Sequence, residues 1–116
     1  MSKVWVVNYS GHKIHKAKQY GEIVILTRGK VNVFQGDRLM YELVEQMKDI
    51  IEEDYILISG TPILNVFVLT IALTLIGKVN YLLYDARDNE YYIRTLIAED
   101  VSRIIEEVKH GVKVED

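Results

Sequence analysis

A chain of 116 residues with 49% apolar side chains is long enough for one domain with a buried core. The net charge of −3 argues against broad, non-specific binding of duplex DNA. Cysteine is absent, which excludes disulfides and thiolate zinc sites and fits a reducing compartment or a hot environment. We expect a cytoplasmic location, the host cytoplasm if the protein is viral. We therefore expect a single domain over residues 1–116.

Two buried strands are expected in the first 30 residues. Residues 3–8 (KVWVVN) and 22–27 (EIVILT) are short apolar runs rich in β-branched side chains. The segment between them is polar and basic, and Ser10-Gly11 marks a turn. Residues 31–34 fit either a short strand or an extended connector.

Residues 54–85 are the most informative segment. A buried strand runs through a Ser-Gly-Thr-Pro turn into an almost wholly apolar helix, and a glycine separates that helix from another strand. Such a unit is typical of a parallel α/β sheet, which binds ligands at the carboxyl ends of its strands. The apolar run 62–76 is shorter than the roughly 20 residues that a membrane span needs. We therefore expect a core helix and no membrane partner.

A hairpin and two amphipathic helices complete the pattern. Apolar residues follow Asp37 at spacings of three and four, and they recur in this way over residues 99–110. A tight turn at residues 86–90 joins strands 79–84 and 91–97 into an antiparallel hairpin. The sequence thus predicts a Rossmann-like α/β sandwich, with a mainly parallel central sheet, an antiparallel edge hairpin and helices on both faces.

Two polar turns form the candidate ligand site. Ser59, Gly60 and Thr61 follow the third strand, where two hydroxyls and a helix N-terminus suit phosphate or carboxylate, although Thr61 could simply cap the helix. Neither a phosphate-loop nor a dinucleotide-binding glycine pattern is present. Parallel strands end at the same edge of a sheet, so we expect this turn to face the residues after strand one: Asn8, Tyr9, Ser10 and Gly11.

The basic loop after the first strand contains the candidate catalytic groups. His12 or His15 would act as a general acid or base, and Lys13 or Lys16 would stabilise charge developing on a phosphate. An exposed loop with incidental histidines explains the same residues. A His-x-x-His metal site would lack a nearby acid or cysteine, so we expect no metal and no cofactor.

Three further residues could reach the ligand. Asp85 suits a ribose hydroxyl and Arg87 a phosphate, although turn bonding within the hairpin also explains both. Asn65, in the first turns of the apolar helix, either reaches the pocket or bonds to neighbouring backbone. The clustered tyrosines of the hairpin could stack on bases or form core and dimer interface: Tyr81, Tyr84, Tyr91 and Tyr92.

The order SGTP, apolar helix, GKVNY, strand and YDARDNE resembles the second half of the CRISPR-associated Rossmann-like (CARF) domains that sense cyclic oligoadenylates. This resemblance implies a ligand pocket at a twofold interface, formed by residues 8–12 and 59–61. The chain departs from that family's pattern, with one glycine where two are frequent and Pro62 where a lysine is frequent. The charge that contacts phosphate would therefore come from residues 11–18.

Three hypotheses follow from these patterns. The first is a small dimeric protein that binds an anionic, nucleotide-type ligand such as a cyclic oligoadenylate. The second is a metal-independent nuclease that acts on that ligand. The third is a non-enzymatic protein–protein interaction module, encoded by a virus or mobile element. A homodimer is expected because helix 62–76 and the hairpin expose much apolar surface, which a second subunit or the terminal helix would cover.

Overall fold

The computed structural model describes residues 2–11 and 13–111, and their strands form one sheet. The strands are β1 (Lys3–Tyr9), β2 (Glu22–Arg28), β3 (Tyr55–Leu57), β4 (Lys78–Asp85) and β5 (Glu90–Ile97). A 3₁₀ helix, η1 (His15–Tyr20), links β1 to β2, and the α-helices are α1 (Asp37–Met47), α2 (Pro62–Ile76) and α3 (Ala98–Lys109). Residues 31–34 form no strand and are therefore a connector.

The sheet has the strand order β2-β1-β3-β4-β5. Neighbouring strands from β2 to β4 pair in parallel, whereas β5 pairs with β4 antiparallel. This arrangement confirms the predicted α/β class with its parallel centre and antiparallel edge hairpin. The strands are largely apolar because a parallel sheet needs cover on both faces.

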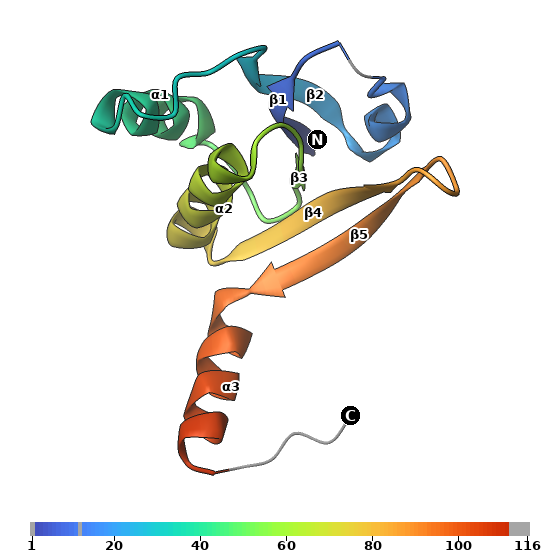
Figure 1. Ribbon diagram of the computed structural model, residues 1–116. Helices are drawn as coiled ribbons and strands as arrows, with labels where there is room; N and C mark the ends of the chain where they lie inside the picture. Colours follow the sequence, from blue (N-terminus) through green and yellow to red (C-terminus); the bar gives the residue numbers. More distant parts are fainter. Residues whose placement is uncertain (1, 12, 112–116) are drawn as a thin grey trace.

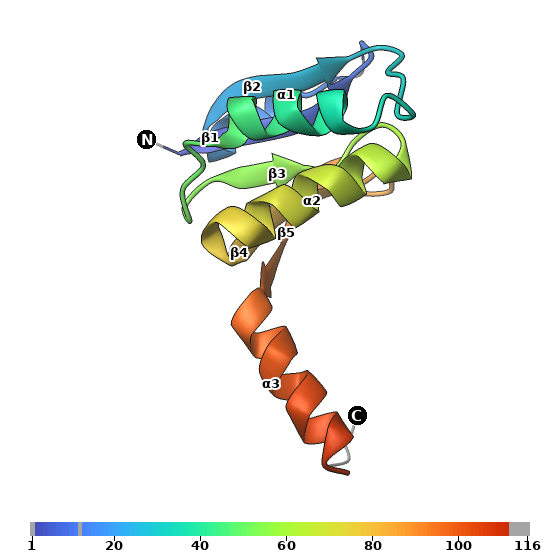
Figure 2. The ribbon, with the colours of Figure 1, turned by 90° about the vertical axis from the view of Figure 1, so that its left-hand side faces the viewer.

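Helices lie on both sides of the sheet. α1 and α2 lie side by side on one face (Figure 2), whereas η1 packs against the other (Figure 1). The alternation of side chains along β1 divides the core accordingly. Trp5 and Val7 belong to the cluster under α1 and α2, and Val4 and Val6 belong to the cluster beside η1.

The short strand β3 is tied to β1 at both ends by side-chain hydrogen bonds. Before β3, the buried Asp54 carboxylate accepts bonds from the Lys3 backbone N–H (2.8 Å) and the Trp5 indole N–H (3.1 Å). After β3, the Ser59 hydroxyl accepts a bond from the Asn8 backbone N–H at 3.0 Å. These bonds align the carboxyl ends of β1 and β3.

The terminal helix α3 projects away from the rest of the protein (Figures 1 and 2). β5 ends at Ile97 and α3 begins at Ala98, so no residue connects the two elements. No residue of α3 is buried, and α3 therefore does not cover α2 of its own chain. Within the described ranges, no helix has the length and apolar character needed to cross a membrane.

Candidate functional site

The direction of the chain connections changes at β1, because β2 lies on one side of it and β3 on the other. In open α/β sheets, ligands bind beside the carboxyl ends of the strands at such a switch point. Both polar turns lie at this position, and the bond from Asn8 to Ser59 joins them directly. The structure thus places side by side two segments that are about 50 residues apart in the chain.

Asn8 and Gly60 lie against each other where the two turns meet. The Asn8 side chain is buried, and its amide donates to the Thr27 hydroxyl (2.9 Å) and the Gly29 carbonyl (2.8 Å). Gly60 has a φ of +78°, and a Cβ on it would lie 2.6 Å from the Asn8 Cβ. Asn8 therefore has a structural role, because its buried side chain packs against the Ser59-Gly60 turn that borders the site.

Asn65 also has a structural role. Its side-chain oxygen accepts a bond from the Ser59 backbone N–H at 3.1 Å. Its amide group donates to the carbonyls of Ser59 (2.9 Å) and Thr61 (2.8 Å). Of the two alternatives for Asn65, the structure shows bonding to neighbouring backbone, which holds the turn before α2 in shape.

A groove opens beside the Ser59-Gly60 turn. One part has a volume of about 400 Å³ and is lined by Lys13, Leu57, Ile58, Ser59, Gly60, Tyr84 and Tyr91. The other part, of about 330 Å³, is lined by Lys13, His15, Lys16, Tyr84, Asn89 and Tyr91. Because Lys13, Tyr84 and Tyr91 line both parts, we treat them as one feature, the switch-point groove.

Two tyrosines from the hairpin form one wall of the switch-point groove. Tyr84 and Tyr91 are directly paired across β4 and β5, and their ring centroids are 5.3 Å apart with planes tilted by 60°. Tyr91 is buried, whereas Tyr84 is half exposed and bonds through its hydroxyl to the Asn89 side chain. Burial, and then the neighbouring Tyr84, raise the pKa of the Tyr91 phenol, which therefore keeps its proton at neutral pH.

The basic residues of the loop differ in what they contact. The Lys16 ammonium donates to the Asn89 carbonyl at 2.6 Å and lies 3.5 Å from the Glu90 carboxylate, so it fastens η1 to the hairpin tip. Among the described residues, the Lys13 ammonium makes no ion pair, and it is exposed. His15 is exposed on the same groove. His12 lies outside the described residues.

Other candidate residues lie near the switch-point groove but do not line it. The Arg28 guanidinium lies over the Tyr9 ring, 5.7 Å from its centroid, and Ser10 and Gly11, which follow Tyr9 in the chain, are exposed. Thr61 occupies the N-cap position of α2, yet its side chain makes no capping hydrogen bond. The exposed Thr61 side chain is therefore accessible to a ligand.

Asp85 and Arg87 bond to each other at the hairpin turn. The Asp85 carboxylate accepts bonds from the Arg87 backbone N–H (2.9 Å) and from its guanidinium (3.0 and 3.2 Å). The guanidinium bond, followed by the backbone bond, lowers the pKa of Asp85. Neither residue lines the switch-point groove, so the turn chemistry accounts for their positions.

The sequence did not point to every residue of the groove. Leu57, Ile58 and Asn89 line it without having been considered for it, and Tyr84 and Tyr91 were considered only within a tyrosine cluster that could stack on bases or form core and dimer interface. Strand pairing supplies the missing signal, because a hairpin centred on residues 86–89 puts these two tyrosines opposite each other. Asn89 adopts a φ of +55° in that turn, a conformation that asparagine tolerates well.

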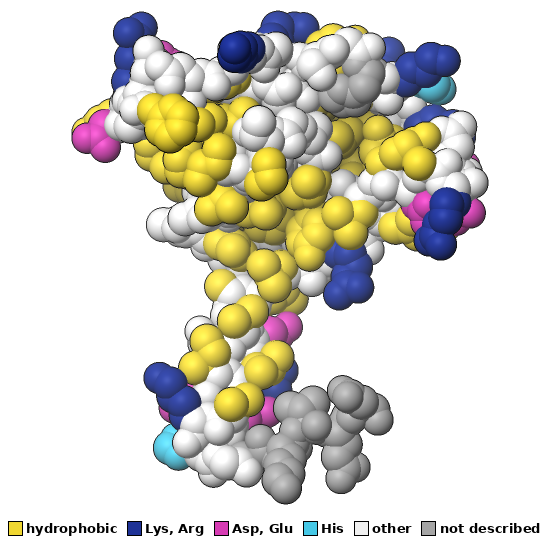
Figure 3. All heavy atoms as spheres, viewed as in Figure 1, with side chains coloured by type: hydrophobic (Ala, Val, Ile, Leu, Met, Phe, Trp, Pro, Cys, Tyr) yellow, Lys and Arg dark blue, Asp and Glu magenta, His cyan; other side chains and the backbone are white. Residues whose placement is uncertain are grey.

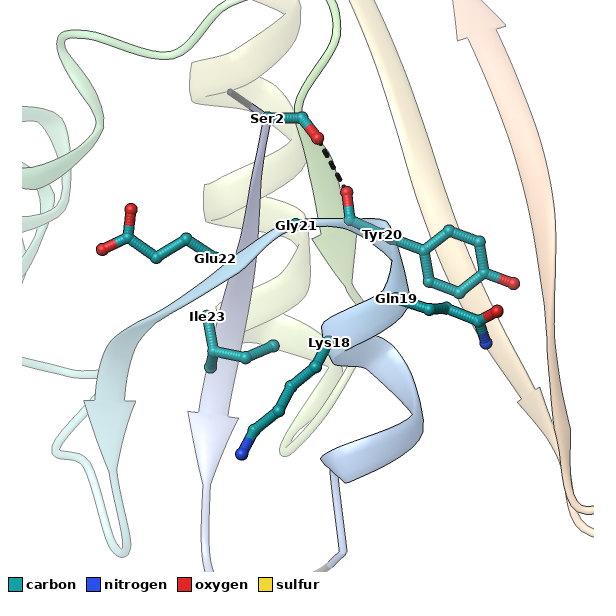
Figure 4. Close-up of a pocket in the computed structure, with 7 residues that line it drawn as sticks. All are labelled: Ser2, Lys18, Gln19, Tyr20, Gly21, Glu22 and Ile23. Carbon is teal, nitrogen blue, oxygen red and sulfur yellow. Dashed lines mark hydrogen bonds between the residues drawn. The ribbon is translucent and has the colours of Figure 1, made fainter.

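A larger cavity lies elsewhere, at the amino ends of β1 and β2. It has a volume of about 570 Å³ and is lined by Ser2 and residues 18–23. Figure 4 shows that the side chains of Lys18, Tyr20 and Glu22 point in different directions and share no common centre. Parallel sheets bind ligands at the opposite edge, so we place the candidate site in the smaller switch-point groove.

Residues 2–96 match the family described as "phage Pam3 gp32-like protein". The chain belongs to this family. The matched segment contains both polar turns and the whole switch-point groove, and it ends before α3. No curated protein and no solved structure matches the chain. A family described by a phage protein agrees with the expectation of a viral or mobile-element protein.

Proposed function

We propose that the protein binds a small anionic ligand of the nucleotide type in the switch-point groove. The observation that carries this proposal is the meeting of three kinds of group in one groove. Lys13 supplies a positive charge, Ser59-Gly60 supplies a polar turn, and Tyr84 supplies a half-exposed aromatic ring. Aromatic rings stack on bases of any sequence, and a lysine ammonium binds phosphate as a point charge.

The dimensions and the composition of the groove support this ligand class. Its larger part, about 400 Å³, falls in the range of roughly 300–1,000 Å³ that is usual for small-molecule sites. Leu57 and Ile58 add apolar wall next to the tyrosines, which suits the flat face of a base. The resemblance to CARF domains makes cyclic oligoadenylates the first ligands to test.

Titration calorimetry tests the proposal with AMP, ATP, linear and cyclic oligoadenylates, and inorganic phosphate as probes. We expect saturable heat with at least one nucleotide and weaker binding after Lys13→Ala or Tyr84→Ala. Lys48→Ala is the matched control, because Lys48 is an exposed lysine at the C-cap of α1 that pairs with Glu45. Absence of heat with every probe, in a folded sample, would contradict the proposal, and so would equal losses in the variants and the control.

Metal-independent cleavage of the bound nucleotide is a second candidate function. The observation that favours it is that His15 lines the groove together with Lys13 and Lys16, which brings a proton-transfer group close to positive charge. Cleavage should then proceed in the presence of EDTA and disappear in His15→Ala while binding persists. Intact probe after prolonged incubation would leave only the binding function.

A further inference from the structure

The helix α3 has an apolar stripe that no element within residues 2–11 and 13–111 covers. Its members lie at spacings of three, one and three, and they are 39% to 56% exposed: Val101, Ile104, Ile105 and Val108. An isolated helix shorter than about 12–15 residues is marginal in water, and α3 has 12 residues. A stable α3 therefore requires a surface on which this stripe can pack.

The sheet of the same chain cannot supply that surface. Connections between strands and helices in α/β proteins usually contain about 2–6 residues, whereas β5 runs directly into α3. The Ala98 backbone N–H donates to the Gly77 carbonyl at 2.9 Å, which fixes the junction at the end of α2. α3 therefore leaves the body and points away from it (Figure 1).

The body has a matching uncovered apolar surface. α2 exposes Ile63 and Val66 on its outer side, and the hairpin exposes the directly paired Leu83 and Tyr92. Leu83 lies an even number of residues after the buried Val79 in β4, so it lies on the face of the sheet that α2 covers, and its partner Tyr92 shares that face. We call these four residues the α2–hairpin surface. Figure 3 shows apolar side chains running over α2 and the hairpin and onto α3 on one side of the molecule.

Charge is also complementary between the two elements. α3 carries four acids against two basic residues, Arg103 and Lys109, and the acids are Glu99, Asp100, Glu106 and Glu107. The hairpin exposes Arg94, which pairs across the strands with Tyr81 and therefore lies on the same face as Leu83 and Tyr92. An acidic helix with an apolar stripe thus fits an apolar surface that carries an arginine.

We propose that α3 docks on the α2–hairpin surface of a second copy of this chain, and that the second copy's α3 docks back in the same way. α3 is only about 18 Å long, and specific interfaces bury roughly 1,200–2,000 Å² in total. A twofold exchange doubles the contact and satisfies the stripe and the receiving surface of both copies at once. A different partner that covered only one of them would leave the other exposed.

Sedimentation velocity and light scattering of the full chain test this proposal. We expect a dimer for the wild type, and monomers for Ile104→Glu in the stripe and for Val66→Glu on the receiving surface. Tyr41→Glu is the matched control, since Tyr41 is 77% exposed on α1 and should leave the dimer intact. A monomeric wild type at tens of micromolar would overturn the proposal, as would a dimer that survives Val66→Glu.

Circular dichroism adds a readout that distinguishes loss of the interface from loss of the fold. Without a partner, α3 loses its packing surface, so the helical signal should fall in Val66→Glu although residue 66 lies in α2. The near-ultraviolet signal of Trp5, buried in the core, should stay unchanged in all variants. An unchanged helical signal in a monomeric Val66→Glu would show that α3 is stable without the second copy, contrary to the proposal.

Discussion

Gly60 lies against the Asn8 side chain so closely that no other residue fits at position 60 without movement. A Cβ there would be 2.6 Å from the Asn8 Cβ and 3.1 Å from its Cγ, and the φ of +78° is unfavourable for any side chain. The Asn8 side chain cannot simply move away, because its amide bonds to Thr27 and Gly29. This contact holds the two turns of the switch-point groove together.

We therefore predict that Gly60→Ala lowers the free energy of unfolding by about 2–3 kcal/mol, from backbone strain and the clash combined. Urea unfolding measures this loss. Gly36→Ala is the matched control, because Gly36 also has a positive φ (+58°) but its Cβ would meet nothing within 4 Å. That variant should lose only about 1 kcal/mol. Equal losses would show that the contact with Asn8 does not limit position 60.

Asp54 should be important for stability, because it is a buried carboxylate that accepts three N–H bonds. They come from the Lys3 backbone, the Trp5 indole and the Ile51 backbone, at 2.8, 3.1 and 3.0 Å. Asp54→Ala leaves these donors without an acceptor and should cost about 3 kcal/mol in urea unfolding. The exposed Asp49→Ala should cost less than about 0.5 kcal/mol. Similar costs for both would mean that water replaces the carboxylate.

The ion pair at the hairpin turn predicts a local pH dependence. The Arg87 side-chain bond, and then its backbone bond, lower the pKa of Asp85, so any stabilisation from the pair is present above the ordinary pKa of about 3.9. That stabilisation is lost as the pH falls through the lowered pKa of the folded state. Carbon-detected NMR should show Asp85 titrating below the ordinary value. In Arg87→Ala the pKa should return toward it, and an unchanged value there would contradict the assigned cause.

Lys13 and Lys16 should behave differently although both line the switch-point groove. Lys16 bonds to the Asn89 carbonyl and pairs with Glu90, so Lys16→Ala should speed amide hydrogen exchange at the hairpin tip and in η1. Lys13 forms no ion pair among the described residues, and Lys13→Ala should change neither exchange nor stability beyond about 0.5 kcal/mol. Faster amide exchange at the hairpin tip in Lys13→Ala would contradict the prediction that only Lys16 stabilises the tip.

The sequence predicted the sheet and the meeting of the two polar turns at one edge of it, because both depend on local patterns. Buried apolar strands joined by an apolar helix imply parallel pairing, and parallel pairing aligns the ends of β1 and β3. The structural roles of Asn8 and Asn65 could not be predicted from local patterns, because an asparagine side chain at either position can bond to a ligand or to other groups of the protein. The partners that decide, Thr27 for Asn8 and the Ser59 backbone for Asn65, depend on exact strand register.

The orientation of α3 was also beyond the sequence pattern. Its apolar stripe correctly predicted a helix, but the pattern is the same whether the stripe packs on its own sheet or on another molecule. The deciding feature is that β5 ends at Ile97 and α3 begins at Ala98, with no loop residue between the two elements. A shift of two residues at either boundary would have provided a loop, and boundaries are the least reliable part of a prediction from periodicity.

The short strand β3 has a mechanical consequence. It is the shortest strand of the sheet and lies at its centre, where three residues on each side join β1 to β4. The sheet thus consists of two broader halves that meet at a narrow seam, and the side chains of Asp54 and Ser59 reinforce this seam at its two ends. A slip of β3 by two residues relative to β1 would break the hydrogen bonds of Asp54 and of Ser59 at the same time. Under tension, or early in unfolding, the molecule should come apart along this line.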